Sequence, residues 1–317
     1  MISVIVTFHN IGWLIGRCLE SLSIQTYQEY EVILVDNGST DKSKKVVDEV
    51  KKGIKRLHYY YIDHQDVNSA INYGIDRASG EYLFFLNGCD FLNQNALHFL
   101  YWGLISSGSD IMIGDYDEVG YLTKKANITQ APEDICVKKY NAKQMLLRMN
   151  TPAMHPDIRL NRLWNKLYKS NLFNGVRLSK GSGAEVKTIW DIVSKCNRIG
   201  SEFFVTYFRA ESPESVQCDM SLAEAYEERL KYYENNYDEL TVNHTYFLLI
   251  TNLLYIYKSN KDTEIKEKCI YRINQIIEEH PNIYINRNKE RYIHKISKKY
   301  LDNLDKKCYH TIKQVTN

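Results

Sequence analysis

The N-terminal part of the chain alternates between short apolar runs and stretches that carry apolar residues at helical spacing. Continuous β-branched and aromatic runs predict buried strands, and they occupy residues 2–6, 30–35, 57–62 and 81–86. Between them, apolar side chains recur every three or four positions, which predicts helices over residues 13–22, 41–52 and 67–78. This βαβα order is typical of a parallel sheet with helical crossovers.

Polar clusters follow three of these predicted strands. They read Thr7-Phe-His-Asn10, Asp36-Asn-Gly-Ser-Thr40 and Asn87-Gly-Cys-Asp90. Ligands of parallel sheets bind beyond the carboxyl ends of the strands, so the three clusters are expected to meet at one edge. The pattern therefore predicts a ligand site there.

The rest of the chain changes character twice. Residues 93–209 give a mixed pattern, with predicted strands at 110–116 and 203–208 and predicted helices at 143–149 and 185–196. After Pro213 every pattern is helical: a capping box opens at Ser221, and apolar stripes follow over residues 265–276 and 292–304. We expect a boundary near residue 216, with an all-helical C-terminal region over residues 217–317.

Composition and charge exclude several classes of protein. The 41 Lys and Arg residues against 39 Asp and Glu give a net charge of +2, which is too even to indicate nucleic acid as a partner. Seven cysteines with no close pair exclude a CxxC metal or redox site and disfavour a secreted disulfide framework. The N-terminus lacks a signal-peptide pattern, and the longest apolar run, residues 246–257, is too short to cross a bilayer. A cytoplasmic location is expected.

The order and spacing of the motifs resemble those of a known enzyme family. The motifs are the three polar clusters together with Glu31-Val-Ile-Leu-Val-Asp36, Ala70-Ile-Asn-Tyr-Gly74 and Gly80-Glu-Tyr-Leu-Phe-Phe-Leu-Asn87. Over about residues 1–215 the chain resembles the family 2 inverting glycosyltransferases of GT-A fold, in their bacterial polysaccharide and glycoprotein branch. The resemblance implies a Rossmann-like, mostly parallel α/β sheet flanked by helices. It also implies a nucleotide-binding half over residues 1–92 and an acceptor half over residues 93–216.

The resemblance implies the transfer of a sugar from a nucleotide-activated donor, for which UDP-sugars are favoured, to a hydroxyl group of a glycan, glycoprotein or lipid-linked acceptor. Asp36 would accept a hydrogen bond from the uracil N–H; the alternative is an Asp that caps the next helix, a role that Asp41 also fits. His9 stands where the family has an aromatic that packs on the base, and a structural His is the alternative. The residues expected at the nucleotide are Thr7, Phe8, His9, Asp36, Asn37, Asp66, Asn87 and Gly88.

The segment Asn87-Gly-Cys-Asp90 occupies the place of the family's acidic cluster, where a divalent cation bridges carboxylates and the diphosphate. Asn87 and Cys89 replace two of the acids, which leaves Asp90 as the predicted ligand of Mn²⁺ or Mg²⁺. The family's nucleotide-binding Arg is also replaced, by Ile71, and Lys166 or Arg209 is the candidate substitute. Weak metal binding, metal independence and loss of activity therefore all stay open.

Inverting transfer needs a general base that removes the proton of the acceptor hydroxyl. The family places it in a Glu-Asp pair that opens a helix, and this pair reads Ala184-Glu185 here. Glu185 is therefore the predicted base, with a solvated Glu favoured by the helix dipole as the alternative. Asp191 is the rival acid, but it lies six residues later and faces another direction. The residues expected on the acceptor side are Asp115, Trp164 and Lys166.

Two functions remain after this comparison. The first is an active transferase, and the second is a catalytically degenerate GT-A domain that binds an active transferase, which the replacements at positions 71, 87, 89 and 184 favour. The C-terminal region, with its apolar stripes and the lysines between residues 295 and 307, is expected to cap the first domain and to form a homo-oligomer. Peripheral contact with an acidic membrane at its inner face is the alternative.

Overall fold

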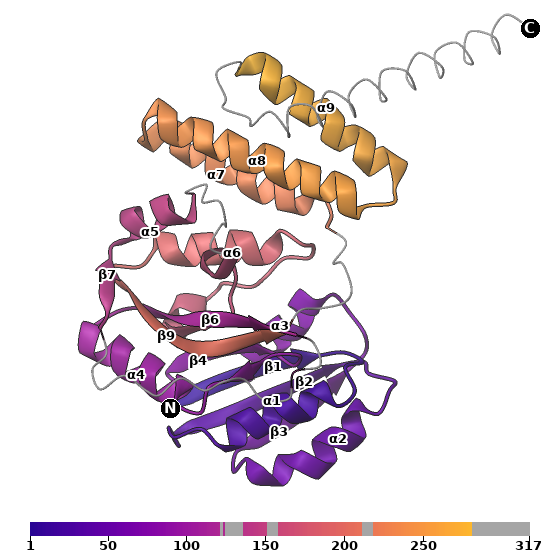
Figure 1. Cartoon of the computed structure of the whole chain (residues 1–317), viewed down its shortest axis with the longest axis vertical. Helices are drawn as coiled ribbons and strands as arrows, with labels where there is room; N and C mark the ends of the chain where they lie inside the picture. The colour runs from indigo at the N-terminus through magenta and orange to yellow at the C-terminus, as the bar shows by residue number, and fades with distance from the viewer. Residues whose placement is uncertain (121–122, 124–135, 151–157, 211–217, 281–317) are drawn as a thin grey trace, which may run out of the picture. The chain divides into compact units, whose positions relative to one another are not determined.

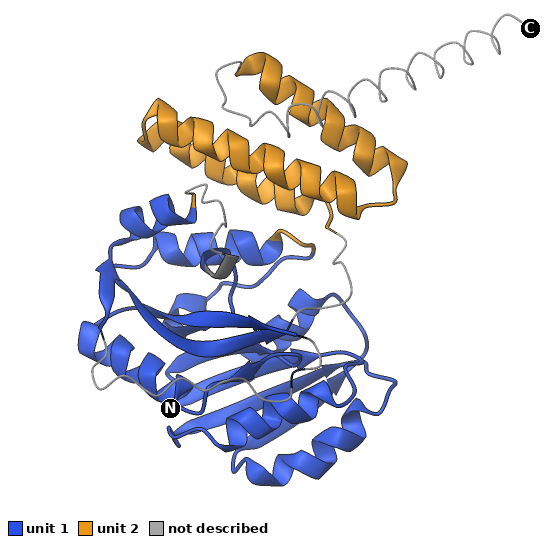
Figure 2. Cartoon of the chain, viewed as in Figure 1, with its two compact units in different colours: residues 1–149, 157–180, 184–214 blue, residues 150–156, 181–183, 215–317 orange. Residues whose placement is uncertain are grey.

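The computed structural model describes residues 1–120, 123, 136–150, 158–210 and 218–280. The chain divides into two compact units (Figure 2). The first unit comprises residues 1–149, 157–180 and 184–214, and the second comprises residues 150–156, 181–183 and 215–317. The described part of the second unit contains the helices α7 (Ser221–Asn236), α8 (Glu239–Ser259) and α9 (Thr263–Glu279). The predicted stripe at 292–304 and its lysines lie outside the described residues.

One mixed sheet forms the centre of the first unit, with strand order β3-β2-β1-β4-β8-β6-β9-β5 (Figure 1). The four strands predicted first run parallel to one another, and they are β1 (Ile2–Phe8), β2 (Tyr30–Asn37), β3 (Leu57–Ile62) and β4 (Tyr82–Asn87). Short β8 (Lys166–Lys169) lies antiparallel between β4 and β6 (Ile111–Val119). Long β9 (Ile199–Ala210) runs parallel to β6 and also pairs with β5 (Phe91–Leu92) and β7 (Lys138–Tyr140).

Helices cover both faces of this sheet because its central strands are apolar on both sides. Val4 and Val6 of β1 belong to the core cluster that also contains residues of α1 (Leu14–Ser23), α2 (Ser43–Val50) and α4 (Ala96–Ser107). Ile5 faces α3 (Val67–Ile75), where a Cβ on Gly74 would lie 2.4 Å from Ile5 Cγ2. Further on, α5 (Ala142–Met149) packs against α6 (Ala184–Ser194). Short 3-10 helices lie at Lys51–Gly53, Ile158–Asn161 and Ser170–Phe173.

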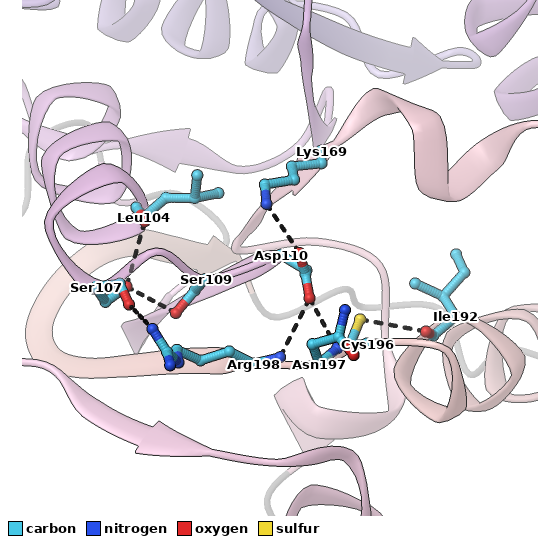
Figure 3. A network of polar contacts seen from close by, with 9 residues as sticks. All are labelled: Leu104, Ser107, Ser109, Asp110, Lys169, Ile192, Cys196, Asn197 and Arg198. Carbon is cyan, nitrogen blue, oxygen red and sulfur yellow. Dashed lines mark hydrogen bonds and ion pairs between the residues drawn. The ribbon is translucent and has the colours of Figure 1, made fainter.

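A polar network fixes the amino ends of β6 and β9 (Figure 3). Asp110, directly before β6, accepts a hydrogen bond from Lys169 Nζ at 2.9 Å and from the backbone N–H groups of Asn197 and Arg198 at 2.8 and 3.1 Å. Burial raises the pKa of the Asp110 carboxyl, but these three donors outweigh it and leave the pKa lowered. The network holds the end of the sheet opposite to the carboxyl ends of β1, β2 and β4.

Two further features concern the helices and the cysteines. None of the helices in the described ranges is both long enough and apolar enough to cross a membrane. The cysteines for which the structure gives a position form no disulfide with one another, and they are Cys18, Cys89, Cys136, Cys196, Cys218 and Cys269.

Candidate active site

The carboxyl ends of β1, β2 and β4 lie side by side, as the sequence predicts. Phe8 of β1 pairs with Asp36 of β2, and Thr7 pairs with Asn87 of β4. This register brings the three polar clusters to one edge of the sheet. Thr7 and His9 are half-buried there, Phe8 is buried, and Asn87 is exposed.

Asp36 is only 1% exposed, and two protein groups orient its carboxylate. Oδ1 accepts the backbone N–H of Ser39 at 2.8 Å, and Oδ2 accepts the hydroxyl of Tyr59, on β3, at 2.8 Å. Burial, followed by the hydrogen bond to Asp36, raises the pKa of Tyr59, so its hydroxyl stays protonated and donates. The start of α2 is instead held by Asp41, one residue before the N-cap Lys42, whose Oδ1 accepts the N–H of Ser43 at 2.9 Å.

Two histidines lie together above the end of β2. The ring centroids of His9 and His64 are 4.1 Å apart, and the Nδ1 atoms of both rings lie within 3.0 Å of the carbonyl oxygen of Asn37. A carbonyl only accepts, so both Nδ1 atoms carry the proton. The amide nitrogen of Asn10 lies 3.1 Å from His9 Nε2, on the other side of the ring.

The segment after β3 is tied to the turn after β2. Asn37 Nδ2 donates to the carbonyl of Gln65 at 2.9 Å, and its Oδ1 accepts the N–H of Gln65 at 3.0 Å. Gly38 has φ +78°, and a Cβ there would lie 2.6 Å from the backbone nitrogen of His64. The Asn37 side chain therefore holds the His64 segment rather than facing the open edge.

Asp66 begins α3 as its N-cap, where its side chain accepts the N–H of Asn68 at 2.9 Å. Five residues later Ile71 fills the place of the family's arginine. Its neighbour Asn72 makes two hydrogen bonds to the backbone of Leu178, at 2.8 and 2.9 Å. The predicted nucleotide residue Asp66 thus has a structural function at the helix start.

The segment Asn87–Asp90 forms a tight turn beyond β4. Two backbone hydrogen bonds hold it. The N–H of Gly88 donates to the carbonyl of Thr7 at 3.0 Å, and the N–H of Asp90 donates to the carbonyl of Asn87 at 2.9 Å. The Asn87 side chain accepts the N–H of Cys89 at 3.1 Å. Asp90 points inward: it is 5% exposed, and it accepts the hydroxyl of Tyr207 at 2.5 Å and the N–H of Ala210 at 2.9 Å.

Aromatic side chains connect this turn to β6 and to the segment before β8. Half-buried Trp164 stacks on Tyr207, with ring centroids 5.0 Å apart and planes 27° apart, and Tyr116 meets Trp164 edge-on at 5.2 Å. Asp115, directly before Tyr116, is half-buried, and its carboxylate accepts the N–H of Tyr116 at 2.9 Å. Asp115 and Trp164 therefore lie in one region, which continues to Asp90 through Tyr207.

Lys166 does not present its charge to this region. The side chain is 1% exposed, and Nζ donates to the carbonyl oxygens of Arg162 at 2.6 Å and Trp164 at 3.4 Å. Burying an ammonium group costs free energy unless hydrogen bonds offset it, and these carbonyl oxygens supply such bonds. This geometry does not fit the predicted contact between Lys166 and an acceptor.

Glu185 lies in the first turn of α6 and is half-buried. Its Oε1 accepts the N–H of Leu163 at 2.6 Å, and its Oε2 forms an ion pair with Arg162 at 2.9 Å. Asp191 differs, because its carboxylate lies 3.7 Å from Lys187 on the surface of the same helix. Glu185 is thus fixed against the segment that carries Trp164, and Asp191 is not.

Comparison with known proteins decides the family. A family model described as "Glycosyl transferase family 2" matches residues 3–169. The chain belongs to that family. Among curated relatives of this transferase, glycosyltransferase GlyG of Streptococcus pneumoniae is 27% identical over 70% of this chain and 76% of its own length. Glycosyltransferase GlyA of the same organism is 27% identical over 58% of this chain, which spans about a quarter of GlyA (26%).

Solved structures show the same fold. S. aureus TarS 1–349 in complex with UDP matches this transferase with a TM-score of 0.64 and 17% identity, over 95% of this chain and 88% of that one. The mannosyltransferase PcManGT of Pyrobaculum calidifontis, in complex with GDP-Man and Mn²⁺, matches with a TM-score of 0.53 and 13% identity, over 95% and 84%. The predicted GT-A architecture is therefore confirmed.

The donor set of this transferase does not fit a divalent cation. Among the described residues, no three His, Cys, Asp or Glu side chains are placed to hold a metal ion. Both oxygens of Asp90 accept protein donors below the surface. Burial, followed by the charge of Asp90, raises the pKa of Cys89 to about 11, so the thiol stays protonated at neutral pH and is a poor ligand.

Sequence patterns missed four residues that shape the site. They are Tyr59, His64, Tyr207 and Arg17, of which Arg17 donates to the carbonyl of Cys89 from α1. Tyr207 lies in the strand predicted at residues 203–208, and this strand is the one available signal. The other three act through contacts between residues far apart along the chain, which no local pattern encodes.

Proposed function

We propose that this transferase binds a UDP-sugar at the shared edge of β1, β2 and β4. It then moves the sugar, with inversion at the anomeric carbon, to a hydroxyl group of a glycan, glycoprotein or lipid-linked acceptor. The meeting of His9, Asp36 and Asn87 at that edge carries the proposal. TarS, which shares the fold, has been solved with UDP and with UDP-GlcNAc, which supports the choice of donor.

Each residue has a chemical task in this proposal. Asp36 is oriented by Tyr59 and Ser39, and its remaining lone pairs accept the uracil N–H. The paired rings of His9 and His64 offer an aromatic face to the base. Exposed Asn87 donates its amide N–H to the ribose or a phosphate.

The acceptor half, residues 93–216, supplies the proton transfer. Glu185 removes the proton of the attacking hydroxyl, and Arg162 and the Leu163 N–H hold its carboxylate in place. Trp164 provides an aromatic surface for an acceptor sugar, and Asp115 is the next candidate base. A divalent cation has no part in these steps, since the described residues do not fit one.

The binding of UDP tests the nucleotide site. We expect Asp36→Ala to weaken UDP binding by about 1.5–3 kcal/mol, the contribution of a hydrogen bond to a charged group, measured by calorimetry. Asp41→Ala is the matched control, because the Asp41 carboxylate accepts the N–H of Ser43 at the start of α2 and should not contact the base. UDP affinity that is unchanged in Asp36→Ala would contradict the assignment.

A second candidate function is a binding partner of an active transferase. It is favoured by the contacts of Glu185, whose two oxygens already accept Leu163 and Arg162. A screen of UDP-sugars for hydrolysis and transfer separates the two functions. Turnover of any donor supports the enzyme, whereas UDP binding with no turnover of any donor supports the partner.

A further inference from the structure

The turn Asn87–Asp90 is held from beneath by groups of two distant elements. Arg17 of α1 donates to the carbonyl oxygen of Cys89 and, with its other terminal nitrogen, to that of Thr123. From β9, Tyr207 and the backbone of Ala210 donate to the two oxygens of Asp90. Protein groups therefore fix the turn on the side away from the open edge.

Tyr207 contacts both ends of the turn with a single oxygen. Its hydroxyl donates to Asp90 and lies 3.4 Å from the backbone nitrogen of Asn87, whose N–H it accepts. The ring is completely buried and stacks on Trp164, which fixes the direction of the hydroxyl. The position of the Asn87 side chain at the nucleotide edge thus depends on Tyr207.

Arg17 places a permanent positive charge behind the same turn. It is 6% exposed, and its guanidinium lies 4.6 Å from the centroid of the Phe91 ring. An arginine stays protonated in proteins, and a charge that is shielded from water acts more strongly on its surroundings. The Cys89 carbonyl and the Asp90 carboxylate both lie within its electrostatic reach.

We infer that this site binds its nucleoside diphosphate without a divalent cation, because Tyr207 and Ala210 occupy both oxygens of the predicted ligand Asp90, and Arg17 and Tyr207 hold the turn that a cation would otherwise hold. Asp90 is then a buried anchor of the turn rather than a metal ligand, and Tyr207 is a positioning residue for Asn87. The inference rests on the proposed function, since it concerns the same UDP site.

The first test compares UDP binding by the full chain in EDTA and in Mn²⁺, by calorimetry. We expect the two dissociation constants to agree within about threefold, a difference of about 0.7 kcal/mol. Binding that is seen only with Mn²⁺, or that Mn²⁺ strengthens more than about tenfold, overturns the inference and leaves the proposed function standing. No UDP binding in either buffer overturns both.

The second test asks whether Tyr207 positions the turn. Tyr207→Phe removes the hydroxyl and keeps the stacked ring, and we expect it to weaken UDP binding about five- to tenfold in EDTA. Tyr168→Phe is the matched control: it is an equally buried tyrosine that loses one hydrogen bond, to the Leu163 carbonyl at 2.9 Å, outside the turn. We expect a similar fall in Tm for both variants, but an unchanged UDP affinity only for Tyr168→Phe. Equal UDP affinity in the two variants overturns the role of Tyr207.

Asp90→Asn tests the same inference if Tyr207→Phe fails to fold. If Asp90 anchors the turn, UDP affinity depends on it even when no metal is present. This variant should therefore bind UDP about five- to tenfold more weakly in EDTA. If Asp90 is a metal ligand, UDP affinity depends on it only when Mn²⁺ is present. A UDP affinity of Asp90→Asn that is unchanged in EDTA and lowered in Mn²⁺ therefore overturns the inference.

Discussion

In Asp36, Asp90 and Glu185, both carboxylate oxygens form a hydrogen bond or an ion pair with another group of the protein. The sequence could predict that Asp36 and Asp90 end strands and that Glu185 opens a helix, because these are local features. It could not predict their donors, since Tyr59, Tyr207 and Leu163 lie 22 to 117 residues away along the chain. Those donors decide whether an acid faces a ligand or the interior, so the site could be predicted only in part.

Glu185 provides the sharpest test of catalysis. In Glu185→Gln the amide still accepts the Leu163 N–H but cannot take a proton, so kcat for transfer should fall about 10²–10⁴-fold while UDP binding stays intact. Asp191→Asn is the matched control and should transfer sugar normally. Should the two variants behave the other way round, Asp191 is the base.

Glu202, on β9, is a buried acid whose Oε1 has no hydrogen-bond partner. Burial raises its pKa to about 8, so the folded state keeps the proton that the unfolded chain releases above about pH 4.5. Stability is therefore lost as the pH rises from about 4.5 to 8, by up to about 1.4 kcal/mol per pH unit.

We expect Glu202→Gln to remove this loss and to stabilise the protein by about 1–3 kcal/mol at pH 7, measured by urea unfolding at several pH values. Glu20→Gln, at an exposed position on α1, should change neither the stability nor its pH dependence. A Glu202→Gln variant with the same pH dependence as the wild type would contradict this account.

Among the elements, the length of an apolar run and its unbroken pattern decided which strands the sequence could predict. The strands β1 to β4 are apolar runs of six to eight residues bounded by turn residues, and the structure confirms them. The strand β8 has four residues and β5 has two, too few to show a period. The strand β9 begins earlier than predicted, because its register against β6 shifts between Ser201 and Val205 and interrupts the alternation.

The Asp110 network joins three of these elements, and its loss should be measurable. Asp110→Asn removes the ion pair with Lys169 and one hydrogen-bond acceptor. We therefore expect the free energy of unfolding to fall by about 1–3 kcal/mol at pH 7. The folded pKa of Asp110 is lowered, so the contribution of its charge is complete above about pH 4 and is lost below it. Unfolding curves of the wild type and the variant should converge as the pH falls below 4, and a constant difference would contradict the ionic account.

At the scale of the whole molecule, the helical unit is the part whose role stays a prediction. It exposes large apolar side chains, Leu240, Tyr255 and Tyr271, at 65%, 49% and 56%. We expect the full chain to form a homo-oligomer through this unit at micromolar concentration, detected by light scattering. A monomer would contradict that expectation, and pelleting only with anionic liposomes would favour the membrane alternative.

The order of strands in the sheet has a consequence for how the chain folds during synthesis. The strands β3, β2, β1 and β4 are complete once residue 87 has left the ribosome, but β8, the neighbour of β4, arrives only with residues 166–169. Until then β4 presents an unpaired edge with Leu83, Phe84 and Phe85, which invites pairing with other nascent chains. A fragment that ends at residue 92 should therefore aggregate, whereas one that extends through β9 should stay in solution.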